Sequence, residues 1–263
     1  MSGRRPLRAR LDDGDVVMGC FSLLVEPPFV EMLGRAGFDF VLTDCEEVPG
    51  DSYGRRLEDL VRAADAVGLP TLVRPVENVP GAINRALNTG AEGVFIPHVR
   101  TAEEAGAVVR AARYPPLGRR GAAPVIRAAG FGTEPWDDYR ARVDHDNLVF
   151  VMVEDQEAVA NIDAIVAVDG IDGVLVGTWD LAVEMGHAKY GAPAPPVMAL
   201  VERVIEATRS AGLIMAAHGW SADAAAAYVG LGCQVLIVSL DSTLALQGLR
   251  ELRDLAERVE AAR

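Results

Sequence analysis

Two acidic residues close two apolar stretches of the chain. Glu154 ends the run Leu148–Glu154, and Asp180 ends the run Gly173–Asp180. A carboxylate at the end of a buried strand is costly unless a cation faces it. Carboxylate oxygens are ligands that Mg²⁺ and similar ions prefer, so the pair predicts a divalent metal site. The alternative is that Asp180 caps the helix that follows it, because a cap residue binds free backbone amides.

A cationic residue lies within a third apolar run. Arg74 is flanked by apolar residues in Leu72-Val-Arg-Pro-Val. A buried guanidinium needs an anion, which is either a structural carboxylate or a substrate oxygen that becomes negative during a reaction. A metal ion and an arginine that face the same point would stabilise an enolate.

Short apolar runs bounded by turn residues alternate along the chain with stretches of helical spacing. This pattern predicts eight β/α units and therefore a single-domain α/β fold, the (β/α)8 TIM barrel, over residues 1–263. A doubly wound sheet is the alternative, but the first strand is not followed by a glycine-rich dinucleotide fingerprint. The expected strands are Val17–Leu23, Phe38–Asp44, Pro70–Pro75, Gly93–His98, Leu148–Glu154, Gly173–Asp180, Leu213–His218 and Gln234–Leu240, and the expected helices include Arg56–Val67, Ala102–Arg113, Val197–Ala211 and Leu244–Ala261.

In such a barrel the active site forms at the carboxyl ends of the strands. Histidines at strand ends are more often hydrogen-bonded structural residues than ligands, so His98 and His218 are not expected to bind the metal. The connection 114–147 is rich in Pro, Gly and Arg, and we expect a long functional loop or a subunit contact there. The strand-end polar candidates are Asp44, Glu46, Glu47, Arg74, His98, Glu154, Thr178, Asp180, His218 and Asp241.

Composition limits the function classes. The chain has 263 residues and a formal net charge of -13, which disfavours nucleic acid and anionic membranes as partners and favours a small molecule. The start of the chain lacks the apolar segment of a signal peptide, so we expect a cytoplasmic protein. The three cysteines, Cys20, Cys45 and Cys233, are far apart and are expected to be reduced thiols.

Several motifs together resemble the HpcH/HpaI aldolase family, the class II, metal-dependent aldolases that cleave 4-hydroxy-2-oxo acids to pyruvate and an aldehyde. The resemblance runs from about Gly19 to Leu244. It is carried by Asp44-Cys-Glu-Glu-Val-Pro, Arg74-Pro, Arg113-Tyr-Pro-Pro-Leu-Gly-Arg-Arg-Gly121, Val153-Glu154, Asn161-Ile-Asp163, Gly177-Thr-Trp-Asp-Leu181 and Met185-Gly186.

The resemblance implies roles for particular residues. Glu154 and Asp180 match the family's ligands for a divalent metal, which would be Mg²⁺, Mn²⁺ or Co²⁺, and Arg74 matches the arginine that stabilises the pyruvate enolate. Gly177, Thr178 and Trp179 match the pocket for the substrate carboxylate, although Thr178 replaces a common proline and Trp179 replaces a small residue. The resemblance also implies a homo-oligomer, a trimer or hexamer, with subunit contacts through the 114–147 connection and the C-terminal helix.

The family's general-base histidine is the main departure. Family members usually read Asp-Gly-Glu-His where this chain reads Asp44-Cys-Glu-Glu47, and Asn88 stands where the paired aspartate is expected. An asparagine can donate a hydrogen bond to a carboxylate, so Glu47 could act as the base in place of the histidine. We expect Asp44, Glu47 and Arg74 to form the catalytic set. Cys45 is not expected to be a nucleophile, since no histidine adjoins it. Alternatives are another enolate reaction (decarboxylation, an acyl-thioester lyase step or a cyclisation) and a catalytically silent protein that binds a metabolite.

Overall fold

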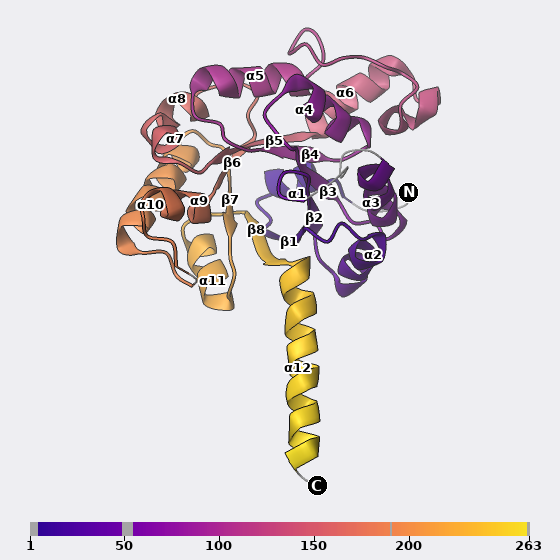
Figure 1. The fold of residues 1–263 in the computed structure, drawn as a ribbon. Helices are drawn as coiled ribbons and strands as arrows, with labels where there is room; N and C mark the ends of the chain where they lie inside the picture. The colour runs from indigo at the N-terminus through magenta and orange to yellow at the C-terminus, as the bar shows by residue number, and fades with distance from the viewer. Residues whose placement is uncertain (1–4, 49–54, 190, 262–263) are drawn as a thin grey trace.

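The computed structural model describes residues 5–48, 55–189 and 191–261. Eight parallel strands close a barrel in the order β1 to β8, which confirms the TIM-barrel prediction (Figure 1). All eight expected strands are present, and most are one or two residues shorter than the apolar runs that predicted them. Their bounds are β1 Val17–Ser22, β2 Phe40–Asp44, β3 Thr71–Arg74, β4 Gly93–Ile96, β5 Leu148–Val153, β6 Gly173–Val176, β7 Ile214–His218 and β8 Val235–Leu240.

Helices surround the barrel and connect successive strands (Figure 1). Several begin with signals that their sequences carry. Thr101 forms a capping box with Glu104 at the start of α5, and proline occupies the first turn of α2, α4 and α10. The helices are α1 Leu7–Asp12, α2 Pro27–Ala36, α3 Arg55–Ala66, α4 Pro80–Asn88, α5 Ala102–Ala112, η1 Arg127–Gly132, α6 Trp136–Asp146, α7 Gln156–Ala160, α8 Ile162–Val166, α9 Thr178–Glu184, α10 Pro195–Ser210, α11 Ala222–Gly230 and α12 Asp241–Ala261.

Alternation along the strands divides the core into two layers. One set of side chains fills the barrel interior, among them Leu42, Leu72 and Phe150. Leu7 and Leu11 of α1 join this interior cluster, and the backbone amide of Leu7 bonds Glu92, which lies just before β4. Helix α1 therefore closes the end of the barrel where the strands begin, and the opposite end stays available for chemistry.

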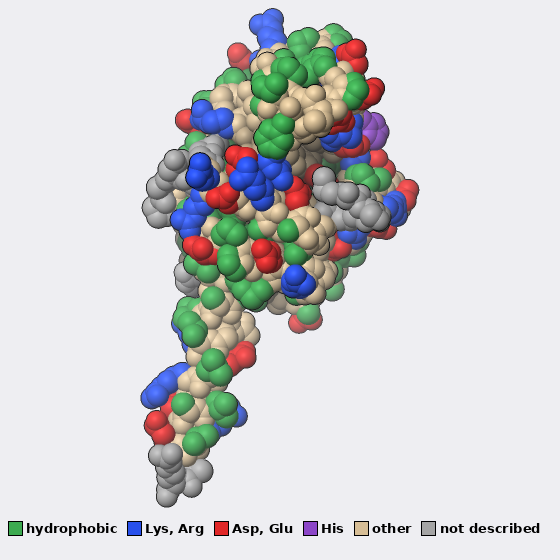
Figure 2. All heavy atoms as spheres, turned by 90° about the vertical axis from the view of Figure 1, so that its right-hand side faces the viewer, with side chains coloured by type: hydrophobic (Ala, Val, Ile, Leu, Met, Phe, Trp, Pro, Cys, Tyr) green, Lys and Arg blue, Asp and Glu red, His purple; other side chains and the backbone are tan. Residues whose placement is uncertain are grey.

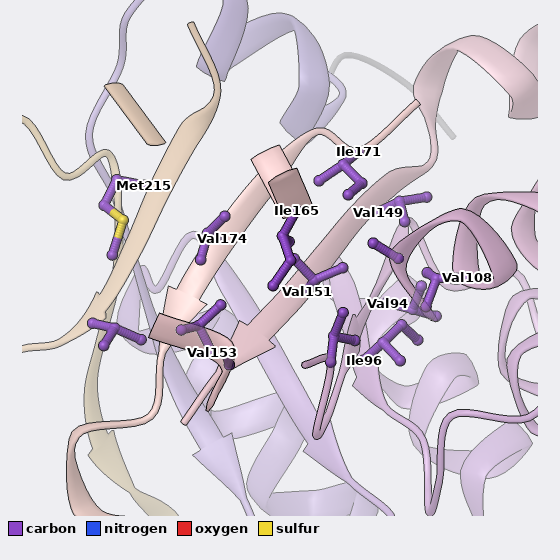
Figure 3. Packing of buried hydrophobic residues seen from close by; sticks show 14 of the residues in the cluster. Val94, Ile96, Val108, Val149, Val151, Val153, Ile165, Ile171, Val174 and Met215 are labelled. Carbon is purple, nitrogen blue, oxygen red and sulfur yellow. The ribbon is translucent and has the colours of Figure 1, made fainter. Parts of the chain in front are cut away.

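The second layer lies between the barrel and its helices. Val149, Val151 and Val153 of β5 point outward, toward side chains such as Val108 of α5 and Ile165 of α8 (Figure 3). β-Branched residues suit strands that are buried on both faces. Because Val153 points outward, the next residue along the chain, Glu154, is directed toward the inside of the barrel mouth.

The secondary structure predicted for two segments is wrong. The connection 114–147 is not a plain loop, because it contains η1 and α6. Tyr139 and Val143 of α6 form a small buried cluster with Tyr114. The charged sequence of α6 and the surrounding prolines and glycines concealed those two apolar residues at i, i+4 spacing. The expected strand Gly173–Asp180 ends at Val176, and its last residues form the first turn of α9.

The last helix stands away from the barrel. Helix α12 begins at the buried Asp241, whose carboxylate accepts hydrogen bonds from the Ser22 hydroxyl and from the backbone amides of Leu23 and Leu24. From this anchor the helix projects beyond the other elements, and hydrophobic side chains are visible along it (Figures 1 and 2). None of the helices in the described part of the chain has the length and apolar character of a membrane span.

Candidate active site

The register of β2 and β3 sets two charged residues side by side at the mouth of the barrel. Asp44 and Arg74 are Cα partners in this pairing, and each ends its strand. Nε and Nη2 of Arg74 donate to the two carboxylate oxygens of Asp44 at 2.9 and 2.7 Å. Asp44 is completely buried. The sequence left two anions open for Arg74, a structural carboxylate or a substrate oxygen. In the structure Asp44 is such a carboxylate, and it fixes the orientation of the guanidinium.

A second carboxylate reaches the same arginine. Oε2 of Glu46 lies 2.7 Å from Nη1 of Arg74. Its other oxygen, Oε1, lies 3.0 Å from Nε2 of His98. Burial, together with repulsion from Glu154 and Asp44, raises the pKa of Glu46 to about 7, against the opposing effect of Arg74 and His98. The Glu46 side chain is 12% exposed, and a pKa near 7 suits a carboxyl that takes up and releases a proton at neutral pH.

His98 contacts both Glu46 and Glu154. Its backbone lies in the left-handed region with φ 54°, which a residue with a side chain seldom adopts. This conformation lets the backbone amide of His98 donate to Oε1 of Glu154 at 2.7 Å, while the ring Nδ1 lies 3.0 Å from the same oxygen. A strained backbone that is held by such contacts is characteristic of functional sites.

Glu154 is packed tightly against the start of α9. It is 3% exposed, and a Cβ atom placed on Gly177 would lie 2.4 Å from the Cβ and 2.8 Å from Oε2 of Glu154. Any larger residue at position 177 would displace the carboxylate. Burial raises the pKa of Glu154, the His98 contacts lower it, and the negative charge of Asp180 raises it further.

Asp180 lies in the first turn of α9 and is exposed to solvent. Gly177 is the N-cap residue of this helix, so the alternative in which Asp180 caps it is wrong. Three carboxylates, those of Asp44, Glu46 and Glu154, thus surround Arg74, and the negative charge of Asp180 acts on Glu154. This excess of hard, negatively charged oxygens fits a divalent cation.

The remaining residues predicted from the sequence lie outside the cluster of ion pairs around Arg74. Glu47 is exposed, on the segment that follows β2. The side-chain oxygen of Asn88 accepts a hydrogen bond from Nη2 of Arg120 at 2.9 Å, so in this structure Asn88 binds an arginine rather than Glu47. Thr178 and the half-exposed Trp179 lie in the first turn of α9, beside Asp180. The catalytic role of Glu47 stays a prediction.

The other half of the mouth is aromatic. The guanidinium carbon of Arg74 lies 4.9 Å from the centre of the Phe21 ring, and the Phe21 ring centre lies 6.3 Å from that of His218. His218 in turn stacks on Trp220, with ring centres 4.9 Å apart and planes 9° from parallel. Burial, assisted by the positive charge of Arg74, lowers the pKa of His218 to about 4. The His218 ring is therefore neutral at physiological pH.

Sequence reasoning gave too little weight to three of these residues. Glu46 and His98 were candidates as strand-end polar residues, but their contacts with Arg74 and Glu154 depend on which way the loops turn. Trp220 was missed. A signal was present in the sequence, because Trp220 follows the inward-pointing His218 by two residues and so continues the inward face of β7.

The chain matches known proteins over most of its length. Residues 17–247 match the model of the HpcH/HpaI aldolase/citrate lyase family. The chain belongs to that family. A hydroxypyruvate/pyruvate aldolase from Pseudomonas aeruginosa is 38% identical over 251 residues, which cover 93% of this chain and 90% of that protein. A 5-keto-4-deoxy-D-glucarate aldolase from Salmonella paratyphi A is 37% identical over 205 residues, 78% of each chain.

Solved structures in the family have the same barrel. A HpcH/HpaI aldolase/citrate lyase family protein from Burkholderia cenocepacia superimposes with a TM-score of 0.87 at 31% identity, over 95% of this chain and 98% of that one. The resemblance inferred from the motifs is thus confirmed. The chain is a carbon–carbon lyase of the class II pyruvate aldolase type, so the lyase prediction is confirmed.

Proposed function

We propose that this site cleaves, or in reverse forms, the C3–C4 bond of a 4-hydroxy-2-oxo acid, with pyruvate as one product and an aldehyde as the other. The observation that carries the proposal is the Arg74 guanidinium, held by buried Asp44 and directed into a mouth that also contains buried Glu154. An oriented cation beside hard oxygen donors suits the developing charge of an enolate.

Glu154 and Asp180 are the residues that would hold the metal, which is Mg²⁺, Mn²⁺ or Co²⁺. When bound, the ion supplies Lewis-acid polarisation of the substrate's 2-oxo group. Among the described residues, no group of three His, Cys, Asp or Glu side chains is assembled to hold a metal, so water and substrate oxygens would complete the ligand set. The excess of carboxylates around Arg74 supports this assignment.

Arg74 would stabilise the oxygen on which the enolate charge develops. Its guanidinium has more N–H donors than the three carboxylate contacts use, which leaves donors for a substrate oxygen. Gly177, Thr178 and Trp179 would bind the substrate carboxylate through main-chain amides at the start of α9, as the family resemblance implies. In this arrangement the substrate's reactive end lies against charged residues at the carboxyl ends of β2, β3 and β5.

Proton transfer has two carboxyl candidates. The departure from the family's pattern favours Glu47, which the structure places on the exposed segment after β2. Geometry favours Glu46, which contacts both Arg74 and His98 and has a pKa raised to about 7. A base works best when its pKa lies near the operating pH, so we assign the proton transfer to Glu46, with Glu47 as the alternative.

The relatives suggest the donor substrate. Two proteins similar to this chain are hydroxypyruvate/pyruvate aldolases, from Pseudomonas aeruginosa and Roseobacter denitrificans. We therefore propose pyruvate and hydroxypyruvate as donors for this chain. Both present a carboxylate for the amides at the start of α9, a carbonyl oxygen for the metal and Arg74, and a carbon that can lose a proton.

The test is proton exchange at the donor in the absence of any aldehyde. Pyruvate in D₂O is followed by NMR with the protein, with and without Mg²⁺ or Mn²⁺. The proposal expects the methyl signal to disappear when the metal is present and to persist when a chelator is added. Exchange should be much slower in the Arg74→Ala variant. If the metal-replete wild type leaves the methyl protons in place, the enolate assignment is wrong.

A further inference from the structure

The charged and aromatic side chains occupy different halves of the barrel mouth. The charged side chains lie at the ends of β2, β3 and β5 or just after them, namely Asp44, Glu46, Arg74 and Glu154, whereas the aromatic ones lie at the ends of β1 and β7 or just after them, namely Phe21, His218 and Trp220. A pyruvate-derived enolate needs the charged half. The second substrate of an aldol reaction must therefore approach over the aromatic half.

The aromatic half is continuous with the donor's anchor. From Arg74 the planar groups follow in order, with Phe21 at 4.9 Å, His218 at 6.3 Å from Phe21, and Trp220 at 4.9 Å from His218. An aldol reaction joins the donor carbon to the aldehyde carbon, so the two substrates must lie side by side. A series of rings that begins at the donor's arginine and ends at solvent provides that neighbouring position.

The outermost ring is both held in place and accessible. Trp220 is 50% exposed. The backbone amide of Gly219 donates to the carbonyl of Ile237 at 2.9 Å, and Ser221 caps α11 by accepting from the amide of Ala224. A Cβ on Gly219 would lie 3.0 Å from Ala225, so the turn is also fixed by close packing. Trp220 therefore presents a fixed, half-exposed indole at the edge of the mouth.

We infer that the His218–Trp220 stack is the acceptor subsite of this aldolase and selects an aldehyde with a planar, aromatic ring. The inference rests on the proposed function and names its second substrate class. A flat ring gains from offset stacking on an indole face, and a saturated ring of similar size does not. The lowered pKa of His218 keeps its ring uncharged, which suits an apolar partner.

The donor methyl group loses one proton, and the resulting enolate carbon forms a bond to the aldehyde carbon. The aldehyde C=O π electrons move to its oxygen, which takes up one proton and becomes the 4-hydroxyl. The product of pyruvate and an aromatic aldehyde is a 4-aryl-4-hydroxy-2-oxobutanoate, and an oxidant or reductant is not required.

The test compares two apolar aldehydes of similar size, benzaldehyde and cyclohexanecarboxaldehyde, with pyruvate and Mn²⁺. The inference expects a higher kcat/KM for benzaldehyde in the wild type. In Trp220→Leu the ratio of the two kcat/KM values should fall about 3- to 10-fold, the range that an aromatic pair contributes, and Trp220→Phe should restore most of it. Phe131→Leu, which removes an exposed ring from η1, is the matched control and should leave the ratio unchanged.

Methyl exchange without aldehyde separates the two proposals. If the wild type exchanges the pyruvate methyl protons but Trp220→Leu keeps the wild-type ratio, the acceptor subsite is wrong and the proposed function stands. The same conclusion follows if neither aldehyde reacts, or if the wild type prefers the saturated ring or a polyhydroxylated aldehyde such as glyceraldehyde. If metal-replete wild type shows neither exchange nor product, the proposed function and this inference are both rejected.

Discussion

Arg74 and Asp44 form a bidentate ion pair across adjacent strands, with the carboxylate completely buried and the guanidinium at the barrel mouth. The register of β2 and β3 makes the two residues direct neighbours, so the fold itself positions the pair. A guanidinium that is oriented before the substrate arrives needs little reorganisation as charge develops. Asp44 is thus a positioning residue, and Arg74 is the group that would touch the substrate.

Asp44→Asn should lower kcat because an amide accepts one hydrogen bond from Arg74 in place of two charge-assisted ones. Such bonds contribute about 1.5–3 kcal/mol, so we expect a loss of roughly 10- to 100-fold. Affinity for Mn²⁺ should change much less. Steady-state kinetics and calorimetry check this, with the melting temperature measured to detect misfolding. Asp39→Asn, which weakens a similar pair with Arg10 outside the mouth, is the control.

Removal of either proposed metal ligand should abolish metal binding. Calorimetry with Mn²⁺ is expected to give a clear binding isotherm for the wild type and none for Glu154→Gln or Asp180→Ala. A chelator should also stop turnover. Glu184→Gln changes another carboxylate of α9, one that accepts from the backbone of Gln156, and should bind the metal normally. Full affinity in Asp180→Ala would exclude Asp180 as a ligand.

Metal affinity should rise with pH across the neutral range. Burial raises the pKa of Glu154, a proposed ligand, and raises that of the neighbouring Glu46 to about 7, so protons compete with a cation for this cluster as the pH falls. Each displaced proton makes the affinity rise up to about tenfold per pH unit below the raised pKa. Mn²⁺ titrations at pH 6 and pH 8, in buffers of different ionisation enthalpy, measure both the slope and the proton release. A flat profile would contradict the raised pKa values.

Much of the fold could be predicted because its signals are local. Each apolar run marks a strand, and alternation along the run fixes which residues face inward, so Asp44, Arg74 and Glu154 were placed at the mouth from sequence. The contacts that build the site depend on turns instead. The left-handed backbone of His98 and the loop that brings Glu46 to Arg74 have no periodic signature. The start of α9 was hidden because Gly173–Asp180 continues as an apolar run without a conventional capping residue.

The proton-transfer group can be identified by two matched variants. Glu46→Gln should slow pyruvate methyl exchange by the ~100- to 10,000-fold typical of a lost general base, because Glu46 is the carboxyl that contacts Arg74 and His98. Glu47→Gln removes a neighbouring but exposed carboxyl and should have a small effect. The reverse order would assign the base to Glu47, as the departure from the family's histidine suggested. Pyruvate binding should survive in both variants.

Helix α12 carries exposed apolar side chains along its length. Six apolar side chains of this helix are between 36% and 65% exposed: Leu244, Leu246, Leu249, Leu252, Leu255 and Val259. Three- and four-residue steps place Leu249, Leu252 and Val259 along one side of a helix that projects from the barrel (Figures 1 and 2). A contiguous exposed apolar row of this kind marks an interface, and we propose that a second copy of the chain covers it within a trimer or hexamer.

Light scattering coupled to gel filtration should therefore give a trimer or hexamer at micromolar concentration. Introducing buried charge with Leu249→Glu and Leu252→Glu together should shift the mass toward the monomer, since an unpaired carboxylate is costly in an apolar contact. Arg250→Glu changes the charge of an adjacent residue without altering the apolar row and should preserve the assembly. A monomeric wild type would reject the proposal. An unchanged mass in the double variant would locate the subunit contact elsewhere, with the 114–147 segment as the next surface to test.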